Sequence, residues 1–400
     1  MLFEALLSVL AGICVGTFTG LVPGIHVNTV VAALLGARLR YDPLLLSVFI
    51  FSVAITHTFL DFVPSVLLGV PSEDTALAIL PAHRMVLAGR AAEAIKLTLI
   101  GSIACLALGA ALMPLYLKAI PAVYGAIEPH LGYILVSCSV ILILSEGGDK
   151  RLWAAAVFLC SGALGMASMR MLQIREPLLP LLTGLFGFSL ILLNLRNKVQ
   201  IPVQVDARVD IAKASLARGI FGGTLAGSIV GFLPGFGPSQ AAVMAGALVG
   251  NKSDREFLVT LGGINTANML FTLVAFLTIG KTRSGAVAGI SRLIGIDMQS
   301  TLLLIGAALL AGGISLAVGM KMAVVFPKAI RRIDYTKLNA AVATGVFLIV
   351  AALSGLFGIA VLLTATALGL AAHFAGVRKM HLMGALIVPA ALWFLGPASF

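Results

Sequence analysis

The length of the apolar stretches most constrains what this chain can fold into. Almost every stretch is apolar for about 17 to 25 residues between short polar breaks, which is the length that a helix needs to span a bilayer. The 400 residues are 60% hydrophobic and only 11% charged, with a mean hydropathy of +1.09. Such a chain cannot hide its apolar surface inside a water-soluble globule. The sequence predicts an all-α polytopic integral membrane protein, one membrane domain over residues 1–400, with about 10–12 transmembrane helices.

The charged residues indicate topology. The net charge is +11, but the 27 lysines and arginines are scattered in short loops rather than gathered on one face, so nucleic acid is not an expected partner. Three loops are basic, at residues 83–96, 196–218 and 321–337, and we expect them to face the cytoplasm. The apolar start has no basic region and no cleavage site, which is typical of a first membrane segment. We expect a multi-pass protein of the cytoplasmic (plasma) membrane.

The chain repeats itself at an offset of 211 residues, the difference between Gly223 and Gly12. Five glycine and proline positions superpose in register: Gly12, Gly16, Gly20, Pro23 and Gly24 on Gly223, Gly227, Gly231, Pro234 and Gly235. We expect two repeated units that contain Pro-Gly-broken helices or re-entrant hairpins. The expected parts are repeat unit 1 at 1–117, connecting helices at 118–212, repeat unit 2 at 213–320 and C-terminal helices at 321–400.

Each copy begins with glycines spaced by four, which give an apolar helix a flat face for close packing. Pro-Gly then ends the helix, because proline lacks an N–H and clashes with the preceding turn, whereas glycine admits turn conformations. Backbone groups freed at membrane depth are costly unless they line a polar cavity, so a break in both copies indicates a binding site. The alternative is a simple kink or a water-side loop with capping residues.

A new helix begins after each break, and its free N–H groups and positive dipole end would face an anion. Further along the second copy, an asparagine- and threonine-containing stretch offers neutral groups suited to a carboxylate or Na⁺, or alternatively to a hydrogen bond between helices. The predicted substrate-binding residues are Pro23, Gly24, His26, Asn28, Thr29, Pro234, Gly235, Gly237, Ser239, Gln240, Asn265, Thr266 and Asn268.

Two ionisable residues interrupt an apolar run. His57 and Asp61 are four apart and so share one helix face. Ionisable groups inside a membrane are expensive and mark functional sites, so we predict ion coupling by these two residues, with Na⁺ or H⁺ as the ion. The alternative is a neutral His-Asp pair that serves packing only. The chain has no nucleophile, P-loop or zinc-protease motif, so we expect no catalytic residue, no metal and no cofactor.

Several segments together resemble the TctA family, the large membrane subunit of tripartite tricarboxylate transporters. They are GTFTGLVPG at 16–24, GSIVGFLPGFG at 227–237, LGVPSEDTAL at 68–77, PAHRMVLAGRAAEA at 81–94 and NTAN at 265–268. The resemblance implies a cation-coupled importer of di- or tricarboxylates that works with a small membrane subunit and an extracytoplasmic binding protein.

The chain also departs from the family pattern. It is shorter than the bacterial subunit, residues 56–58 read THT where the family has a tyrosine-glycine-glycine stretch, and Gly280 is followed by Lys281-Thr282-Arg283 instead of Pro-Gly. We interpret it as a divergent, compact branch, with an archaeal origin and independence of the other subunits as options.

Three functions stay open from the sequence. The first is a secondary active transporter, a permease for a small organic anion coupled to Na⁺ or H⁺, as a monomer or homo-oligomer. The second is a flippase or transporter of a lipid-linked phosphate, which requires a lateral opening to lipid. The third is an intramembrane enzyme, which requires His57 and Asp61 beside a third polar group in a hydrated cavity.

Overall fold

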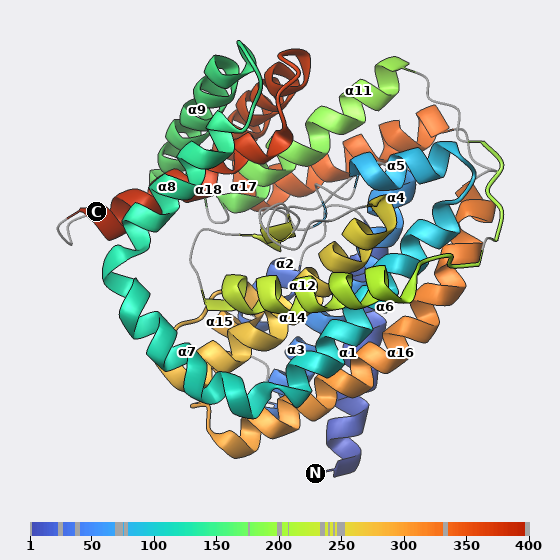
Figure 1. The fold of residues 1–400 in the computed structure, drawn as a ribbon, viewed down its shortest axis with the longest axis vertical. Helices are drawn as coiled ribbons and strands as arrows, with labels where there is room; N and C mark the ends of the chain where they lie inside the picture. The colour runs from blue at the N-terminus through green and yellow to red at the C-terminus, as the bar shows by residue number, and fades with distance from the viewer. Residues whose placement is uncertain are drawn as a thin grey trace.

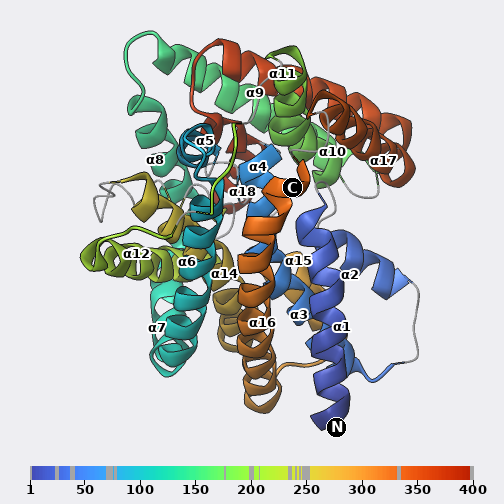
Figure 2. The same ribbon diagram turned by 90° about the vertical axis from the view of Figure 1, so that its right-hand side faces the viewer.

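The computed structural model describes residues 2–22, 27–36, 41–68, 75, 79–174, 177–197, 202–206, 208–232, 237, 238, 241, 242, 245, 253–330 and 335–396. Within these ranges the chain is helical and contains no strand (Figure 1). Eight helices there are long and apolar enough to cross a membrane. Figures 1 and 2 show how the helices are arranged in space. The prediction of an all-α polytopic membrane protein is therefore confirmed.

The helices have the following bounds: α1 (Leu2–Leu21), α2 (Val27–Gly36), α3 (Pro43–Leu60), α4 (Phe62–Leu68), α5 (Ile79–Leu87), α6 (Ala91–Ala111), α7 (Met113–Ile127), η2 (Glu128–His130), α8 (Leu131–Leu144), α9 (Lys150–Arg170), α10 (Leu178–Leu182), the π-helical η3 (Thr183–Phe188), α11 (Ser189–Asn197), α12 (Lys213–Phe232), α14 (Asp254–Ile279), α15 (Gly285–Ser291), α16 (Met298–Ile330), α17 (Tyr335–Phe374), η4 (Lys379–Met383) and α18 (Gly384–Leu395).

The glycines spaced by four make close helix contacts in both halves of the chain. A Cβ added at Gly16 of α1 would lie 2.6 Å from Cβ of Thr56 on α3. A Cβ added at Gly227 of α12 would lie 2.8 Å from Cβ of Ala267 on α14. Gly227 follows Gly16 by 211 residues, and Ala267 follows Thr56 by the same 211. The α1–α3 and α12–α14 pairs thus use equivalent positions, because only glycine lets the helices approach this closely.

The third long helix of each half packs against the second helix of the other half. α6 lies along α14, and α16 lies along α3. The α6–α14 contact is the tighter: a Cβ added at Gly101 would lie 2.0 Å from the carbonyl oxygen of Val259, and one at Gly262 would lie 2.2 Å from that of Thr98. Backbone meets backbone here, so α6 and α14 form one packed element although they come from different halves.

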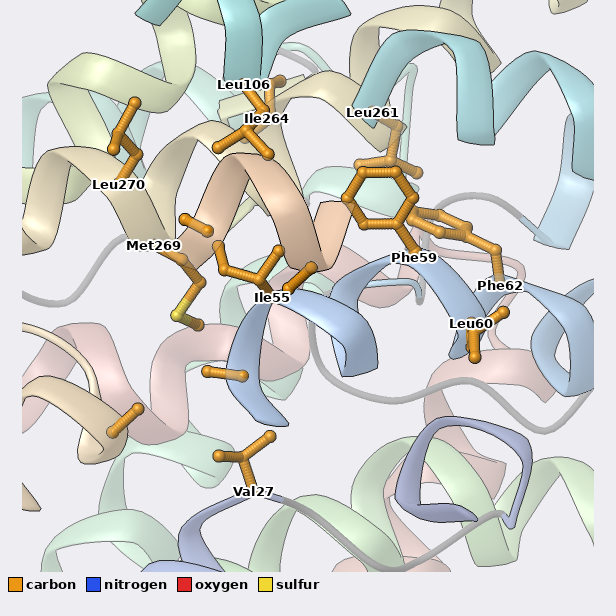
Figure 3. Packing of buried hydrophobic residues seen from close by; sticks show 14 of the residues in the cluster. Val27, Ile55, Phe59, Leu60, Phe62, Leu106, Leu261, Ile264, Met269 and Leu270 are labelled. Atoms are coloured by element: carbon orange, nitrogen blue, oxygen red, sulfur yellow. The ribbon is translucent and has the colours of Figure 1, made fainter. Parts of the chain in front are cut away.

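A large apolar core surrounds these contacts. Figure 3 shows Leu106 of α6 beside Ile264 of α14, and Phe59 of α3 beside Leu261 of α14, and none of these four side chains is exposed. Most of the buried apolar residues of α1, α3, α6, α12, α14 and α16 belong to this one cluster, while Cys105 of α6 packs with Ala267 and Phe271 of α14 in a small cluster of their own. Any polar group among them therefore lies in a low-dielectric setting.

A second core joins two segments that are distant in sequence. α8, α9, α10 and η3 come from the predicted connecting helices, and they pack against α17 and α18 from the C-terminal part (Figure 1). Close backbone contact recurs, since a Cβ at Gly165 would lie 2.0 Å from the carbonyl oxygen of Ala385. α17 is broken at Gly355, whose φ of 64° is left-handed and suits glycine. The boundaries 117/118, 212/213 and 320/321 stay a prediction.

The basic loops gather at one end of the helices. Lys96 donates to Asp206 and holds the pKa of that exposed carboxyl below its usual value, and the charge of Lys328 on α16 adds to the effect. At the same end Arg255 of α14 pairs with the buried Glu93 of α6 over 2.8 Å. Residues from all three predicted basic loops or their flanking helices therefore lie near one another. That this end faces the cytoplasm stays a prediction.

Candidate functional site

α3 carries two ionisable residues into the main core. Its N-terminus is fixed by Asp42, whose side chain accepts from the N–H groups of Leu44 and Leu45. The helix then has no ionisable residue until His57, and Asp61 directly follows its last residue; the two are only 6% and 5% exposed. Both predicted ion-coupling residues are thus buried, where a charge needs specific partners.

The partner of Asp61 lies in the other half of the chain. Nδ2 of Asn265 on α14 donates to Oδ2 of Asp61 over 3.2 Å and to the carbonyl oxygen of Thr58 over 3.4 Å. Next to this contact, the hydroxyls of Thr58 and Thr266 are 3.1 Å apart. We call these four residues the polar seam; it joins α3 to α14. Thr58 pairs with Thr266, whereas Asp61, which comes later in the chain than Thr58, pairs with Asn265, which comes earlier than Thr266.

Two further helices extend hydrogen bonds to α3. Nδ1 of His57 lies 3.1 Å from the hydroxyl of Thr19 on α1, and Ser315 of α16 donates to Thr56 over 3.0 Å. All of these side chains are buried. Thr19 and Ser315 were not predicted from the sequence. Thr19 stands inside the glycine motif of residues 16–24, where its polar side chain could have been noticed, whereas nothing in the sequence distinguishes Ser315.

The equivalent positions in α14 are chemically different. Residues 211 after His57 and Asp61 are Asn268 and Thr272. Thr272 donates to the carbonyl oxygen of Asn268 over 2.8 Å, and its hydroxyl is 3.4 Å from Oδ1 of Asn268. The first half therefore supplies ionisable groups where the second supplies only neutral ones, as the sequence predicted. Thr272 itself was missed.

The helices that precede the two breaks end beside these positions. A Cβ added at Gly20, near the end of α1, would lie 3.3 Å from the backbone nitrogen of Asp61. A Cβ at Gly231, near the end of α12, would lie 3.1 Å from that of Thr272. The C-terminal ends of α1 and α12 thus lie at the level of Asp61 and Thr272, respectively.

The structure describes only some of the remaining predicted substrate-binding residues. Those outside the described residues are Pro23, Gly24, His26, Pro234, Gly235, Ser239 and Gln240. Gly237 is described, and Asn28 lies exposed on α2, where its Oδ1 would be 2.0 Å from a Cβ added at Gly285, the first residue of α15. Thr29 belongs to α2, but its side chain is not described. The described part therefore brings together Asn265, Thr266, Thr58 and Asp61, and places Asn28 against a different helix.

The atoms of the polar seam that could coordinate a cation are oxygen atoms. Oδ1 of Asn265 is buried, and no described group donates a hydrogen bond to it, because the Nδ2 side of the amide faces Asp61 and Thr58. A buried acceptor without a donor costs about 1–3 kcal/mol. Carboxylate, amide and hydroxyl oxygens are ligands of hard cations. Among the described residues, no group of three or more His, Cys, Asp or Glu could hold a metal ion.

Comparisons with known proteins identify the family of the chain. The chain matches the Tripartite tricarboxylate transporter TctA family over residues 6–384. It is also 30% identical to an uncharacterized protein of Methanocaldococcus jannaschii over 409 aligned positions, which cover 98% of this chain and 99% of that protein. No solved structure matches the chain. The family match spans both helix pairs and most of the second core, so this multi-pass membrane protein belongs to the TctA family of tripartite tricarboxylate transporters.

Proposed function

We propose that this chain is a secondary active transporter that moves a small organic anion, a di- or tricarboxylate, across the cytoplasmic membrane. The observation that carries the proposal is the hydrogen bond between Asp61 and Asn265. An aspartate inside a transmembrane bundle costs on the order of 2.5–3.5 kcal/mol even on lenient insertion scales, and such residues are retained for function. Here the carboxylate links α3 to α14, which are the two helices that an alternating-access motion must rearrange.

The anion would bind where the helices are broken. The residues proposed to contact it are those predicted from the sequence, with Asn265, Thr266 and Asn268 contributed by α14. The ends of α1 and α12 lie level with Asp61 and Thr272, which supports a site between the two breaks. Helix N-termini that follow the breaks would offer N–H groups to a carboxylate.

The coupling ion would bind at Asp61. Its carboxylate and the free Oδ1 of Asn265 suit Na⁺, since both are hard oxygen ligands. A proton is the alternative, and His57, hydrogen-bonded to Thr19, would then share it with Asp61. The two ions are separable by experiment, because only one of the two gradients would drive uptake.

The moving parts would not coincide with the repeated units. We propose that residues 1–117 and 213–320 are duplicated units, as the equivalent contacts of Gly16 and Gly227 support. Gly101 and Gly262 hold α6 of the first unit tightly to α14 of the second. In a rocking motion α6 would therefore move with α14, and the polar seam between α3 and α14 would open and close.

Partners follow from the family, which forms tripartite systems. We propose that a small membrane subunit and an extracytoplasmic binding protein assist this chain, and that it carries no catalytic activity, cofactor or nucleic-acid site of its own. A homo-oligomer is compatible with the proposal.

Uptake into proteoliposomes tests the function. The purified chain would be reconstituted and given radiolabelled succinate or citrate while a Na⁺ gradient and a pH gradient are imposed separately. We expect accumulation of at least one carboxylate under one gradient and none in protein-free liposomes. Failure of every carboxylate under both gradients, with and without a cognate binding protein, would contradict the proposal. Scrambling of a fluorescent polyprenyl phosphate by the same vesicles would then indicate the lipid-linked substrate.

A further inference from the structure

An arginine stands at the end of α12, where the second break begins. α14 ends at Gly280, whose φ of 67° is left-handed, and the loop that follows carries Arg283. Nε of Arg283 donates to the carbonyl oxygen of Phe232 over 3.2 Å. Phe232 is the last residue of α12, and such terminal carbonyls lack an intrahelical donor. Arg283 thus satisfies the C-terminal end of the helix that leads into Pro234-Gly235.

The same guanidinium contacts a tyrosine. Nη2 of Arg283 donates to the hydroxyl of Tyr124 on α7 over 3.2 Å, and the guanidinium carbon lies 6.0 Å from the tyrosine ring centroid. Two residues further along the chain, Gly285 begins α15 and lies against Asn28 of α2. Arg283 is therefore placed between the end of α12 and the helix that follows the first break.

The charge of Arg283 is not balanced by an ion pair. Glu128 is the acidic group nearby, but it accepts from Tyr124 over 3.1 Å and pairs with Lys281 over 3.8 Å. No described carboxylate lies within ion-pair distance of Arg283, and its two hydrogen bonds use only part of the five N–H donors of a guanidinium. Burial lowers the pKa of Arg283, yet an arginine titrates so far above neutrality that it stays charged.

This cluster lies at the far end of α14 from the basic loops. α14 has 26 residues, so its two ends are about 39 Å apart at 1.5 Å per residue, enough to cross a bilayer. Arg255 and Glu256 mark one end, and Gly280 marks the other. Arg283 therefore lies on the side of the membrane opposite to the basic loops. With those loops in the cytoplasm, as predicted from the sequence, this is the side from which an imported anion arrives.

We propose that Arg283 is the residue that binds a carboxylate of the incoming substrate at the entrance to the transport site. Tyr124 orients the guanidinium so that its remaining N–H donors form the paired hydrogen bonds that arginine makes with carboxylates. The inference rests on the proposed function, and it assigns the charge recognition that the neutral groups of α14 do not provide. Selectivity for di- and tricarboxylates over monocarboxylates follows, because a second carboxylate is needed to occupy Arg283 and the helix ends together.

The test compares Arg283→Gln with Lys281→Gln. The second substitution removes the same charge two residues away, but the hydrogen bonds to Phe232 and Tyr124 come from Arg283 and stay intact. We expect Arg283→Gln to raise the KM for succinate uptake at least about tenfold, the factor that 1.4 kcal/mol represents, with an unchanged KM for any monocarboxylate that is transported. Lys281→Gln should change KM less than about twofold, and Arg283→Lys should recover part of the affinity. An equal KM in wild type and Arg283→Gln would overturn the inference.

A second readout separates this inference from the proposed function. Stabilisation of the detergent-solubilised protein by succinate or citrate is measured as a thermal shift for wild type, Arg283→Gln and Arg283→Lys. A shift that is lost only in Arg283→Gln supports the inference even where uptake fails; an equal shift in all three, or none in wild type, overturns it. A purely structural Arg283 would lower the melting temperature without ligand and leave the shift intact. Wild type that binds but does not accumulate carboxylate would contradict the proposed transport alone.

Discussion

Asn265 and Asp61 lie 204 residues apart in the chain, and Nδ2 of the first donates to Oδ2 of the second over 3.2 Å. The contact joins α14 to α3 inside the main apolar core. Because neither half of the chain can form it alone, the site exists only when the two halves are assembled. A rearrangement of α3 against α14 must alter the surroundings of this carboxylate, which links ion binding to conformation.

The close approach of α6 and α14 predicts sensitivity to a single methyl group. Gly262→Ala would place a Cβ 2.2 Å from the carbonyl oxygen of Thr98, so the helices must separate. Overpacking of this kind lowers the free energy of unfolding by about 1–3 kcal/mol. Gly306→Ala on α16 is the control, because no atom lies within 4 Å of its added Cβ. Thermal denaturation in detergent should show a lower melting temperature for the first variant only; equal melting temperatures would refute the tight packing.

The threonine pair of the polar seam predicts a measurable coupling. Valine at Thr58, at Thr266 or at both keeps the shape and removes the hydroxyls that are 3.1 Å apart. Hydrogen bonds between membrane helices contribute about 0.6 kcal/mol on average in double-mutant cycles. We expect a coupling energy of about this size from equilibrium unfolding of the four proteins. Strictly additive effects would show that the two hydroxyls do not interact.

The second core predicts a loss of stability in acid. Glu146, in the loop between α8 and α9, is 8% exposed. Burial alone would raise its pKa, but hydrogen bonds from Arg378 and His381 outweigh that effect and hold the pKa below its usual value. A depressed carboxyl pKa contributes stability that is present above the unfolded-state pKa and is lost as the pH falls through the folded-state pKa. The melting temperature of wild type should therefore fall in that acidic range.

Glu146→Gln checks this assignment. The substitution should lower the free energy of unfolding by about 1–3 kcal/mol near neutral pH, since a charged hydrogen bond is replaced by a neutral one. It should also reduce the fall of the melting temperature at acidic pH. Asp149→Asn in the same loop is the control, because Asp149 is exposed and makes no capping hydrogen bond with its side chain. An identical fall of the melting temperature at acidic pH in wild type and Glu146→Gln would contradict the role given to Glu146.

The sequence predicted the parts of this fold that depend on local pattern. Glycines spaced by four, such as Gly12 and Gly16, predicted close packing, and both make it. The burial of His57 and Asp61 also followed from the apolar run around them. Periodicity and hydropathy are properties of single segments, so they are visible without knowledge of the neighbours.

Long-range partners were not predictable in the same way. Asn265 was expected to bind substrate or, alternatively, to form a hydrogen bond between helices, but no pattern indicated Asp61 as its partner. His381 is buried against Glu146, over 200 residues earlier in the chain, and no sequence pattern links the two residues. Arg283 was noticed only as a departure from the family, because its position at the end of α12 depends on how α14 and α12 pack. Such contacts are fixed by tertiary packing, which local sequence does not encode.

Gradient-driven uptake by Asp61→Asn tests the central claim most directly. The amide keeps the size of the side chain and a hydrogen bond to Asn265, but it removes the charge that would bind Na⁺ or a proton. Asp149→Asn is the charge-matched control on the surface. We predict that Asp61→Asn folds with a normal melting temperature and still exchanges labelled for unlabelled carboxylate, while its gradient-driven accumulation falls at least about tenfold, which corresponds to 1.4 kcal/mol of coupling. Accumulation by Asp61→Asn at the wild-type level, under the same Na⁺ or pH gradient, would contradict the account.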